Sequence, residues 1–308
     1  MIRGVLNVNK PSGISSYDVI RRLKPVFEAC CRDRGLKPRH TAVGHAGTLD
    51  PMATGVLLLL LGEATKASGL LLRQPKGYEA DVLFGKRTDT DDVTGEVVEE
   101  LPVPDISARQ LGDALKQLTG TIQQSPPVFS ALKQDGRPMY ELARAGRPVR
   151  TEPRTVTIHE LELLDWTPPR ARLRCLVSSG TYVRSLAREL GPALGTVATL
   201  SRLVRTRVGR FTVELAATPD SITELNLADR LVPIEEALPD VPVMTVDADG
   251  ARKLFTGQTV VVSEPRDVSD CAFARTGNGD FLAIVSNDGT GLHAERVIYA
   301  DWPERANQ

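Results

Sequence analysis

The most apolar stretch of the chain, residues 55–72 (GVLLLLLGEATKASGLLL), limits what this sequence can fold into. Glu63 and Lys66 interrupt it, and no other segment is long and apolar enough to span a bilayer. Its first part, VLLLLL, has the composition of a buried strand, and its second part is expected to form a short helix. The N-terminus, MIRGVLNVNKPSG, lacks the apolar segment and cleavage site of a signal peptide, which favours a cytoplasmic protein.

The bulk composition is that of an ordinary globular protein. Hydrophobic residues make up 41% and charged residues 25% of the 308 residues, enough for a large domain with a small one beside it. The formal net charge of -1 argues against a protein that coats nucleic acid indiscriminately. It permits RNA binding, because a basic face can be balanced by acidic residues elsewhere.

The cysteines do not predict a metal site. The chain has four of them: Cys30, Cys31, Cys175 and Cys271. Two are adjacent and are followed by His40 and His45, but zinc-binding cysteines are normally separated by roughly two to four residues. Adjacent side chains point apart, so we expect reduced structural cysteines and no bound metal.

Strand and helix patterns are mixed along the chain without strict βαβ alternation. Strands are expected at residues 2–11, 56–61, 76–85, 155–166, 171–180 and 200–214, and helices at 12–31, 107–120, 139–146 and 181–191. Pro25 should kink or end the first helix. The pattern favours an α+β fold with a mixed central sheet flanked by helices and loops.

Two boundaries divide the chain further. Residues 123–154 form a long excursion with one short helix between two expected strands. Pro239 and Pro242 mark a break, after which short strands with turn signals predict a separate β-rich module. We therefore expect a large domain at residues 1–239 and a small one at residues 240–308.

The densest local signal is the segment GHAGTLDPMATG. Gly44, Gly47 and Gly55 allow backbone geometries closed to other residues. Pro51 pushes Asp50 out of the helical region, so that a carboxylate is presented from a tightly specified loop. Functional residues often lie on such loops. Taken alone, the segment is equally compatible with a simple Asp-Pro turn.

Three other segments carry residues of functional type. Tyr78 lies beside Lys76 on an expected strand, and Tyr182 and Arg184 lie in the first turn of an expected helix. The excursion contributes four basic residues: Lys133, Arg137, Arg144 and Arg147. Each segment also has a plain structural explanation, namely a half-exposed strand tyrosine, a surface arginine and a solvated basic loop.

In their order along the chain, these segments resemble the TruB family of bacterial tRNA pseudouridine-55 synthases. The resemblance runs through NVNKPSGISSYDVI, GHAGTLDPMATGVLLLLLGEATK, YEADVLFGKRTDTDDVTGEV, SPPVFSALKQDGRPMYELARAG, SGTYVRSLARELG and LSRLVRTRVGRF. These motifs cover roughly the first three-quarters of the chain. The resemblance implies a pseudouridine-synthase fold and isomerisation of uridine at position 55, in the T-arm loop of tRNA, by base flipping. It also implies a PUA-like RNA-binding fold for the C-terminal module.

The resemblance assigns roles to individual residues. Asp50 corresponds to the catalytic aspartate, Tyr78 to the aromatic residue that stacks on the target base, and Tyr182 and Arg184 to the pocket tyrosine and the carboxylate's partner. His45, Asp92 and Leu203 correspond to residues around the flipped nucleotide. Lys10 and Pro11 correspond to an N-terminal segment that lies under the active-site loop and are assigned to substrate binding with them. The uracil is retained and no redox change occurs, so we expect no metal or organic cofactor.

Basic residues outside the pocket are expected to hold RNA phosphates. They lie in the segment 32–40, in the excursion, and at four arginines near the end of the resemblance: Arg202, Arg205, Arg207 and Arg210. We expect tRNA as the substrate, no membrane association, no obligatory protein partner and a monomer. Two alternatives stay open: a guide-RNA-dependent synthase subunit and a non-catalytic RNA-binding or tRNA-folding protein.

Overall fold

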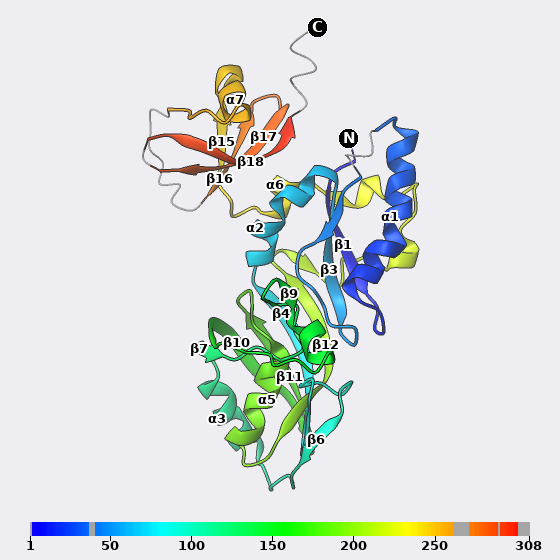
Figure 1. Ribbon diagram of the computed structural model, residues 1–308, viewed down its shortest axis with the longest axis vertical. Coiled ribbons are helices and arrows are strands. Elements are labelled where there is room, and N and C mark those ends of the chain that lie inside the picture. The colour runs from blue at the N-terminus through cyan, green and yellow to red at the C-terminus, as the bar shows by residue number, and fades with distance from the viewer. Residues whose placement is uncertain (1, 37–40, 262–270, 289, 301–308) are drawn as a thin grey trace.

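A computed structural model describes residues 2–36, 41–261, 271–288 and 290–300 of the protein (Figure 1). Its largest element is a ten-stranded sheet in the order β14-β1-β3-β12-β4-β11-β10-β7, with β13 paired to β12 and β2 to β3. The bounds of these strands are β1 Gly4–Lys10, β2 Val43–His45, β3 Thr54–Leu61, β4 Lys76–Phe84, β7 Gly120–Gln124, β10 Arg154–Thr167, β11 Arg170–Val177, β12 Ala198–Val208, β13 Phe211–Thr212 and β14 Leu231–Val232. Strands β3 and β12 run parallel and the other described pairs are antiparallel, so the predicted mixed sheet is confirmed.

Strand β3 is buried on both faces, which explains why its sequence does not alternate. Leu57, Leu59 and Leu61 point into the main core of the large sheet. The other face of the strand, Val56, Leu58 and Leu60, belongs to a second core. Each buried leucine contributes roughly 1.5–3 kcal/mol to folding. No helix in the described ranges is long and apolar enough to cross a membrane.

Helix α1 (Ser16–Asp33) contains a proline, Pro25, whose tendency to end a helix is overridden by packing. Its start is fixed by a capping box between Ser15 and Asp18. The helix continues past Pro25 to its last residue, so the prediction that it could end there is wrong. Leu23 and Phe27, on either side of the proline, are buried in the same core, and this packing holds the helix together.

The remaining helices of the large sheet lie beside its strands. Their bounds are η2 Gly62–Ala67, α2 Ser68–Arg73, α3 Ala108–Gln117 and α5 Val183–Ala193. A capping box between Ser107 and Gln110 begins α3. Helices α3 and α5 lie next to one another on one side of β10, β4 and β12 (Figure 1). A short ribbon of β5 (Lys86–Thr88) and β6 (Val97–Glu100) extends this end of the molecule.

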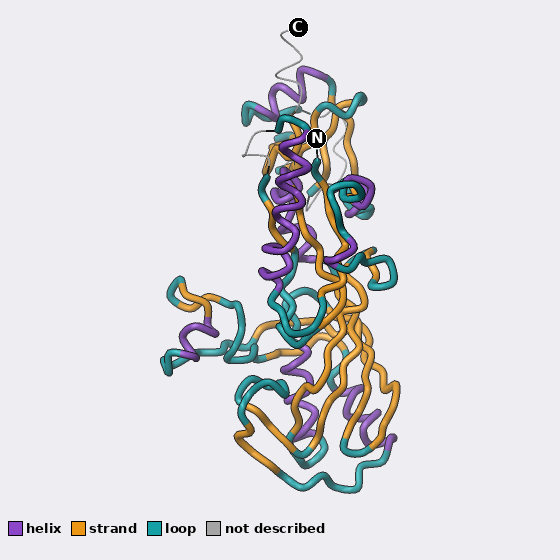
Figure 2. The backbone as a smooth tube through the Cα atoms, turned by 90° about the vertical axis from the view of Figure 1, so that its right-hand side faces the viewer, coloured by secondary structure: helices purple, strands orange, loops and turns teal. Residues whose placement is uncertain are grey.

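The excursion leaves the sheet after β7 and returns at β10. It contains strands β8 (Lys133–Gln134) and β9 (Arg137–Pro138) and helix α4 (Met139–Arg144). Figure 2 shows it as an arm that projects sideways from the body. The short helix expected at residues 139–146 is therefore confirmed as α4. It lies in the projecting arm and not against the large sheet.

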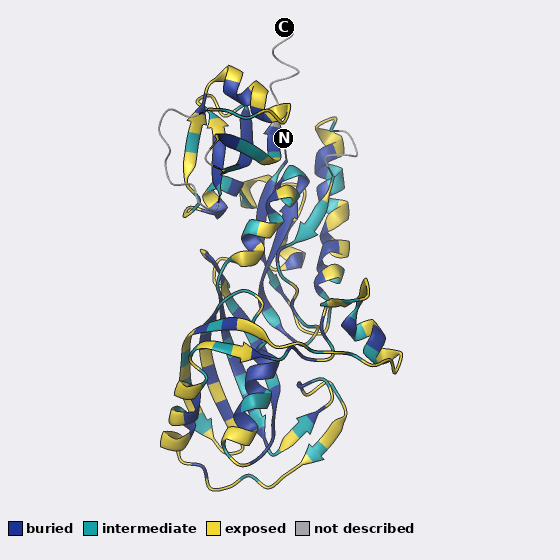
Figure 3. Ribbon diagram, turned by 60° about the vertical axis from the view of Figure 1, so that its left-hand side comes forward, coloured by how far each residue is buried: buried dark blue, intermediate teal, exposed yellow. Residues whose placement is uncertain are grey.

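The C-terminal residues form a second, four-stranded sheet in the order β15-β16-β17-β18, at one end of the molecule (Figure 1). Its elements are β15 Val243–Val246, α7 Ala248–Phe255, β16 Ala272–Thr276, β17 Phe281–Asn287 and β18 Leu292–Ala300, with the short segments η3 Pro219–Ser221, η4 Ala228–Arg230 and α6 Ile234–Ala237 leading to it. Phe273 and Ile284 belong to the same core as Leu58 of β3. The predicted β-rich module thus shares a core with the central sheet, and Figure 3 shows the buried strands at their junction.

Candidate active site

Asp50 lies in the loop that joins β2 to β3, residues 46–53, here called the Asp50 loop. The backbone of Gly47 has φ of 98° and that of Gly55 has φ of 100°, both in the region that favours glycine. A Cβ at position 55 would lie 2.2 Å from the carbonyl oxygen of Arg205, so only glycine fits. These constraints explain the glycine spacing of the motif and fix where the carboxylate is presented.

The carboxylate of Asp50 faces the guanidinium of Arg184 from helix α5. Nε of Arg184 lies 2.9 Å from Oδ2 of Asp50, and its Nη2 donates to Oδ1 at 3.1 Å. The arginine is 4% exposed, whereas the side chain of Asp50 keeps 31% of its surface open. The expected pairing of these two residues is present, and the carboxylate retains a free approach.

Arg184 also holds the surroundings of the carboxylate together. It donates to the carbonyl oxygens of Thr90 and Phe129, each at 2.9 Å. Its Nη1 lies 3.7 Å from Oδ2 of Asp92, whose other oxygen accepts from the backbone and hydroxyl of Thr94 at 2.9 and 2.5 Å. One guanidinium therefore lies between two carboxylates. Burial raises the pKa of Asp50, and the Arg184 guanidinium opposes this shift by stabilising the ionised form.

Lys10 lies beneath the Asp50 loop, as expected. Its Nζ donates to the carbonyl oxygens of Pro11, Ile14 and Pro51 at 2.9, 2.7 and 3.1 Å, and the residue is fully buried. Burial lowers the pKa of Lys10 to about 8, and Asp50 opposes this shift. Pro11 itself is exposed, and its backbone serves as one of the three acceptors. The N-terminal segment is thus bound to the backbone beside the carboxylate.

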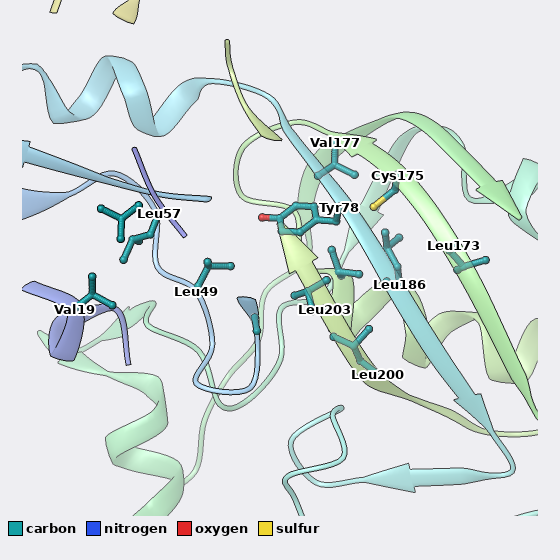
Figure 4. Close-up of a cluster of buried hydrophobic side chains, with 14 of the residues drawn as sticks. Val19, Leu49, Leu57, Tyr78, Leu173, Cys175, Val177, Leu186, Leu200 and Leu203 are labelled. Carbon is teal, nitrogen blue, oxygen red and sulfur yellow. The ribbon is translucent and has the colours of Figure 1, made fainter. Parts of the chain in front are cut away.

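Tyr78 and Tyr182 come from two different elements, strand β4 and the start of helix α5. Tyr78 on β4 is 6% exposed, packed near Cys175 and Leu203, and its hydroxyl points toward the side of the sheet where Leu49 lies (Figure 4). It is therefore far more buried than a half-exposed strand tyrosine. Burial raises the pKa of Tyr78. Tyr182 precedes α5 as its N-cap and donates its backbone N–H to Oε1 of Gln124 at 2.8 Å.

The other predicted pocket residues differ in their surroundings. Leu203 on β12 is 6% exposed and belongs to the same core as Tyr78. His45 ends β2, and its buried Nδ1 finds no hydrogen-bond partner among the described residues. Burial lowers the pKa of His45, and the charge of Arg205 lowers it further. Leu203 thus belongs to the core, and His45 directly precedes the Asp50 loop in the chain.

Most of the predicted basic residues of the excursion line a cavity that Asp50 does not border. Lys133, Arg137 and Arg147 line a cavity of about 860 Å³ within the excursion, together with Arg150 and Arg154. Asp50 and Arg184 are not part of its lining. Arg144 lies outside it as well, with its guanidinium 5.7 Å from the ring centre of Tyr140. The structure thus separates the predicted site into a carboxylate centre and a basic arm.

The predicted phosphate contacts of the arginines on and after β12 stay open for three of them and are wrong for the fourth. Arg202, Arg207 and Arg210 are exposed, as a phosphate contact requires. Arg205 is 1% exposed, so the prediction that it binds phosphate is wrong. The alternation of β12 was the missed signal, because a period of two places Arg205 on the same face as the buried Leu203. Residues 37–40 of the basic segment 32–40 lie outside the described residues.

Sequence reasoning also missed a second ion pair behind Arg184. One turn further along α5, Arg188 binds Oδ2 of Asp91 at 2.5 Å, next to Asp92 in the chain. Asp91 has φ of 62°, a backbone conformation that non-glycine residues rarely adopt. Within the described ranges, no group of three or more His, Cys, Asp or Glu residues is placed to hold a metal ion.

The sequence of the chain matches that of a known protein family. Residues 35–183 match the family model "TruB family pseudouridylate synthase (N terminal domain)". The tRNA pseudouridine synthase B of Burkholderia lata is 40% identical, over 97% of this chain and 91% of that protein. The enzyme of the same name from Aromatoleum aromaticum is 41% identical, over 97% and 93%.

Solved structures give the same fold. The chain matches a crystal structure of a Cbf5-Nop10-Gar1 complex with a TM-score of 0.71 and 24% identity, over 97% of this chain and 85% of the other. It also matches a structure of an H/ACA RNP bound to a substrate RNA containing 2'-deoxyuridine, with a TM-score of 0.68 and 22% identity, over 97% and 86%. At this level of identity the likeness concerns the fold, and it confirms the architecture inferred from the sequence.

Proposed function

The chain belongs to the TruB family of pseudouridylate synthases, and we propose that it isomerises uridine to pseudouridine at position 55 in the T-arm loop of tRNA. Curated relatives that match almost its whole length are named tRNA pseudouridine synthase B. The observation that carries the proposal is the contact of Arg184 with both oxygens of Asp50 inside the matched loop. A cytoplasmic location and a monomeric state are part of the proposal.

The reaction sets clear demands on the site. The bond between C1′ and N1 breaks, the uracil turns, and a bond forms between C1′ and C5. C5 loses its proton to solvent, and N1 takes up a proton in its place. A stacked uridine must first be flipped out, which costs on the order of a few kcal/mol. In our proposal Tyr78 stacks on the freed base, and such stacking contributes roughly 1–3 kcal/mol. Because Tyr78 is 6% exposed, the base must displace its neighbours to reach the ring.

Asp50 acts in its ionised form in this proposal. It attacks C1′, attacks C6 or promotes a glycal-like intermediate, and all three routes require negative charge beside the sugar. Burial disfavours that charge, so a nearby cation is needed. The planar fork of Arg184 supplies it and holds the carboxylate in one orientation. Tyr182 is the candidate for guiding the proton from C5, with Tyr78 as the alternative.

RNA contacts complete the proposal. Lys133, Arg137, Arg144 and Arg147 of the excursion hold phosphates, and His45, Asp92 and Leu203 border the flipped nucleotide. Lys10 and Pro11 support the Asp50 loop from below. We also propose that residues 1–239 form the catalytic domain and residues 240–308 a PUA-like domain that contacts RNA. The target is recognised by its folded shape.

A guide-RNA-dependent synthase subunit is the second candidate, because one of the structures that share this fold is an H/ACA RNP bound to a substrate RNA. The test uses purified protein, an unmodified tRNA transcript and mapping of pseudouridine. Product at position 55 with no guide RNA present supports the proposed function. Product only after a guide RNA is added supports the second candidate. Binding without any product would instead support a non-catalytic RNA-binding protein.

A further inference from the structure

Arg205 is the largest of the fully buried side chains and lies directly behind the Asp50 loop. Its Nε donates to the carbonyl oxygen of Val56 at 2.7 Å, and its Nη2 to that of Gly47 at 2.9 Å. Its Nη1 lies 3.4 Å from the carbonyl oxygen of Thr48 and donates to it as well. The acceptors lie on both sides of Asp50 in the sequence, so one guanidinium joins the two ends of the loop.

The burial of this charge needs a reason. Within the described ranges Arg205 forms no ion pair with a carboxylate, and backbone carbonyl groups alone compensate its desolvation. An apolar side chain would fill the space between β3 and β12 at far lower desolvation cost. The arginine is therefore best explained by what its donors fix, namely the geometry of the Asp50 loop.

A second contact of Arg205 leads to the other side of the site. The side chain of Tyr78 lies opposite Arg205 in the β12–β4 pairing, and the charge of the guanidinium opposes the rise that burial causes in the pKa of Tyr78. The backbone of Arg205 pairs with Gly55, directly after the Asp50 loop. One residue therefore contacts both the support of the catalytic carboxylate and the ring expected to meet the base.

We propose that Arg205 is a positioning residue for the isomerisation: it fixes the Asp50 loop and the hydroxyl of Tyr78 relative to one another and contacts no RNA. This inference rests on the proposed function. Its consequence is that replacement of Arg205 slows the chemical step while tRNA affinity persists. A residue that bound phosphate would show the reverse pattern.

The test compares Arg205→Lys and Arg205→Met with Arg174→Met, a control at an exposed arginine on β11 of the same sheet. Single-turnover rates at saturating tRNA are measured by release of tritium from uridine labelled at C5, and affinity by filter binding. We expect both Arg205 variants to lose about 100-fold in rate, the typical effect of a misplacement near 1 Å, with affinity unchanged. Lysine keeps the charge but cannot donate to three carbonyl groups in one plane.

Chemical rescue separates positioning from a merely structural role. In Arg205→Ala, added guanidinium should restore part of the rate, whereas urea, neutral and of similar shape, should not. Rescue of the melting temperature without rescue of the rate would overturn the proposal, as would weakened tRNA binding with a normal rate. Wild-type protein that forms no pseudouridine would overturn the proposed function, whereas active wild type with unimpaired Arg205→Met would overturn only the role of Arg205.

Discussion

The Asp50 loop is fastened on several sides, whereas the excursion projects from the body and is held mainly by contacts of its own. Ser16, Lys10, Arg184 and Arg205 all bind the loop or its carboxylate from other elements. The basic side chains of the excursion are exposed, and Figure 2 shows the arm apart from the sheet. A chemical step requires a fixed geometry around the reacting atoms, whereas contacts with the phosphates of a folded RNA require side chains that extend from the body.

One contact joins the two regions. Nη2 of Arg184 donates to both Oδ1 of Asp50 and the carbonyl oxygen of Phe129, which lies near the start of the excursion. Changes in the loop should therefore act on the rate, changes in the arm on affinity, and changes at Arg184 on the rate with some loss of stability. The predictions below test this division.

Asp50→Asn should have the largest effect. The amide keeps the size of the side chain but carries no negative charge, so isomerisation should fall below detection while tRNA binding stays nearly intact. Pseudouridine mapping and filter binding measure the two quantities on the same protein. Substantial residual turnover would contradict the central role of this carboxylate.

Arg184→Lys should follow. Lysine cannot contact both oxygens of Asp50 and two carbonyl groups at once, so we expect turnover to fall by about 100- to 1000-fold, the usual effect of losing a preorganised donor. Thermal denaturation monitors the accompanying loss of buried contacts. Near-normal rates in a folded variant would remove the argument from the planar fork.

Lys10 should give a moderate effect that depends on pH. Below its pKa of about 8 the ammonium is charged and donates to three carbonyl groups, and above that pH the charge and one donor are lost. Turnover at saturating tRNA should therefore fall as pH rises through about 8. Lys10→Met should be slower and lack this dependence.

Lys76→Met is the matched control for the pH profile. Burial also lowers the pKa of Lys76 to about 8, but its ammonium donates to Leu72 and Gln74, outside the Asp50 loop. This variant should keep the decline in turnover. A decline that disappears in Lys76→Met and persists in Lys10→Met would reverse the assignment.

Alanine at Lys133, Arg137 and Arg147 together should have the smallest effect on the chemical step. The variant should bind tRNA more weakly, and the slope of log affinity against log salt should become less steep by about 0.7–0.9 per lost phosphate contact. Filter binding across a salt series measures this slope. An unchanged slope would show that the arm does not grip phosphates.

Local signals explain why much of the fold was predictable. Helices α1 and α3 and strand β3 depend on neighbours in the sequence, and each overlaps the range expected for it. Asp50 and Arg184 are far apart in the sequence, and their pairing was expected only because of the family resemblance.

The features that were missed depend on contacts distant in the sequence. The burial of Tyr78 follows from the packing of β4 between β11 and β12, which no single segment encodes. The alternation of β12 places Arg205 on the face of Leu203, but the packing of β12 against β3 and β4 is what buries that face. The continuation of α1 through Pro25 depends on the core beneath the helix. Arg205 is surrounded by other arginines in the sequence, so it resembles a surface residue until the position of β12 in the sheet is known.

The two-sided burial of β3 limits how freely the C-terminal module of this chain could be replaced. Val56, Leu58 and Leu60 share a hydrophobic cluster with Phe273 and Ile284, and strand β18 of the C-terminal module packs against η2, which follows β3. A different domain fused after residue 239 would have to supply an apolar surface that matches this cluster. The module is thus continuous with the packing of the central sheet, and its own apolar face is constrained by that junction.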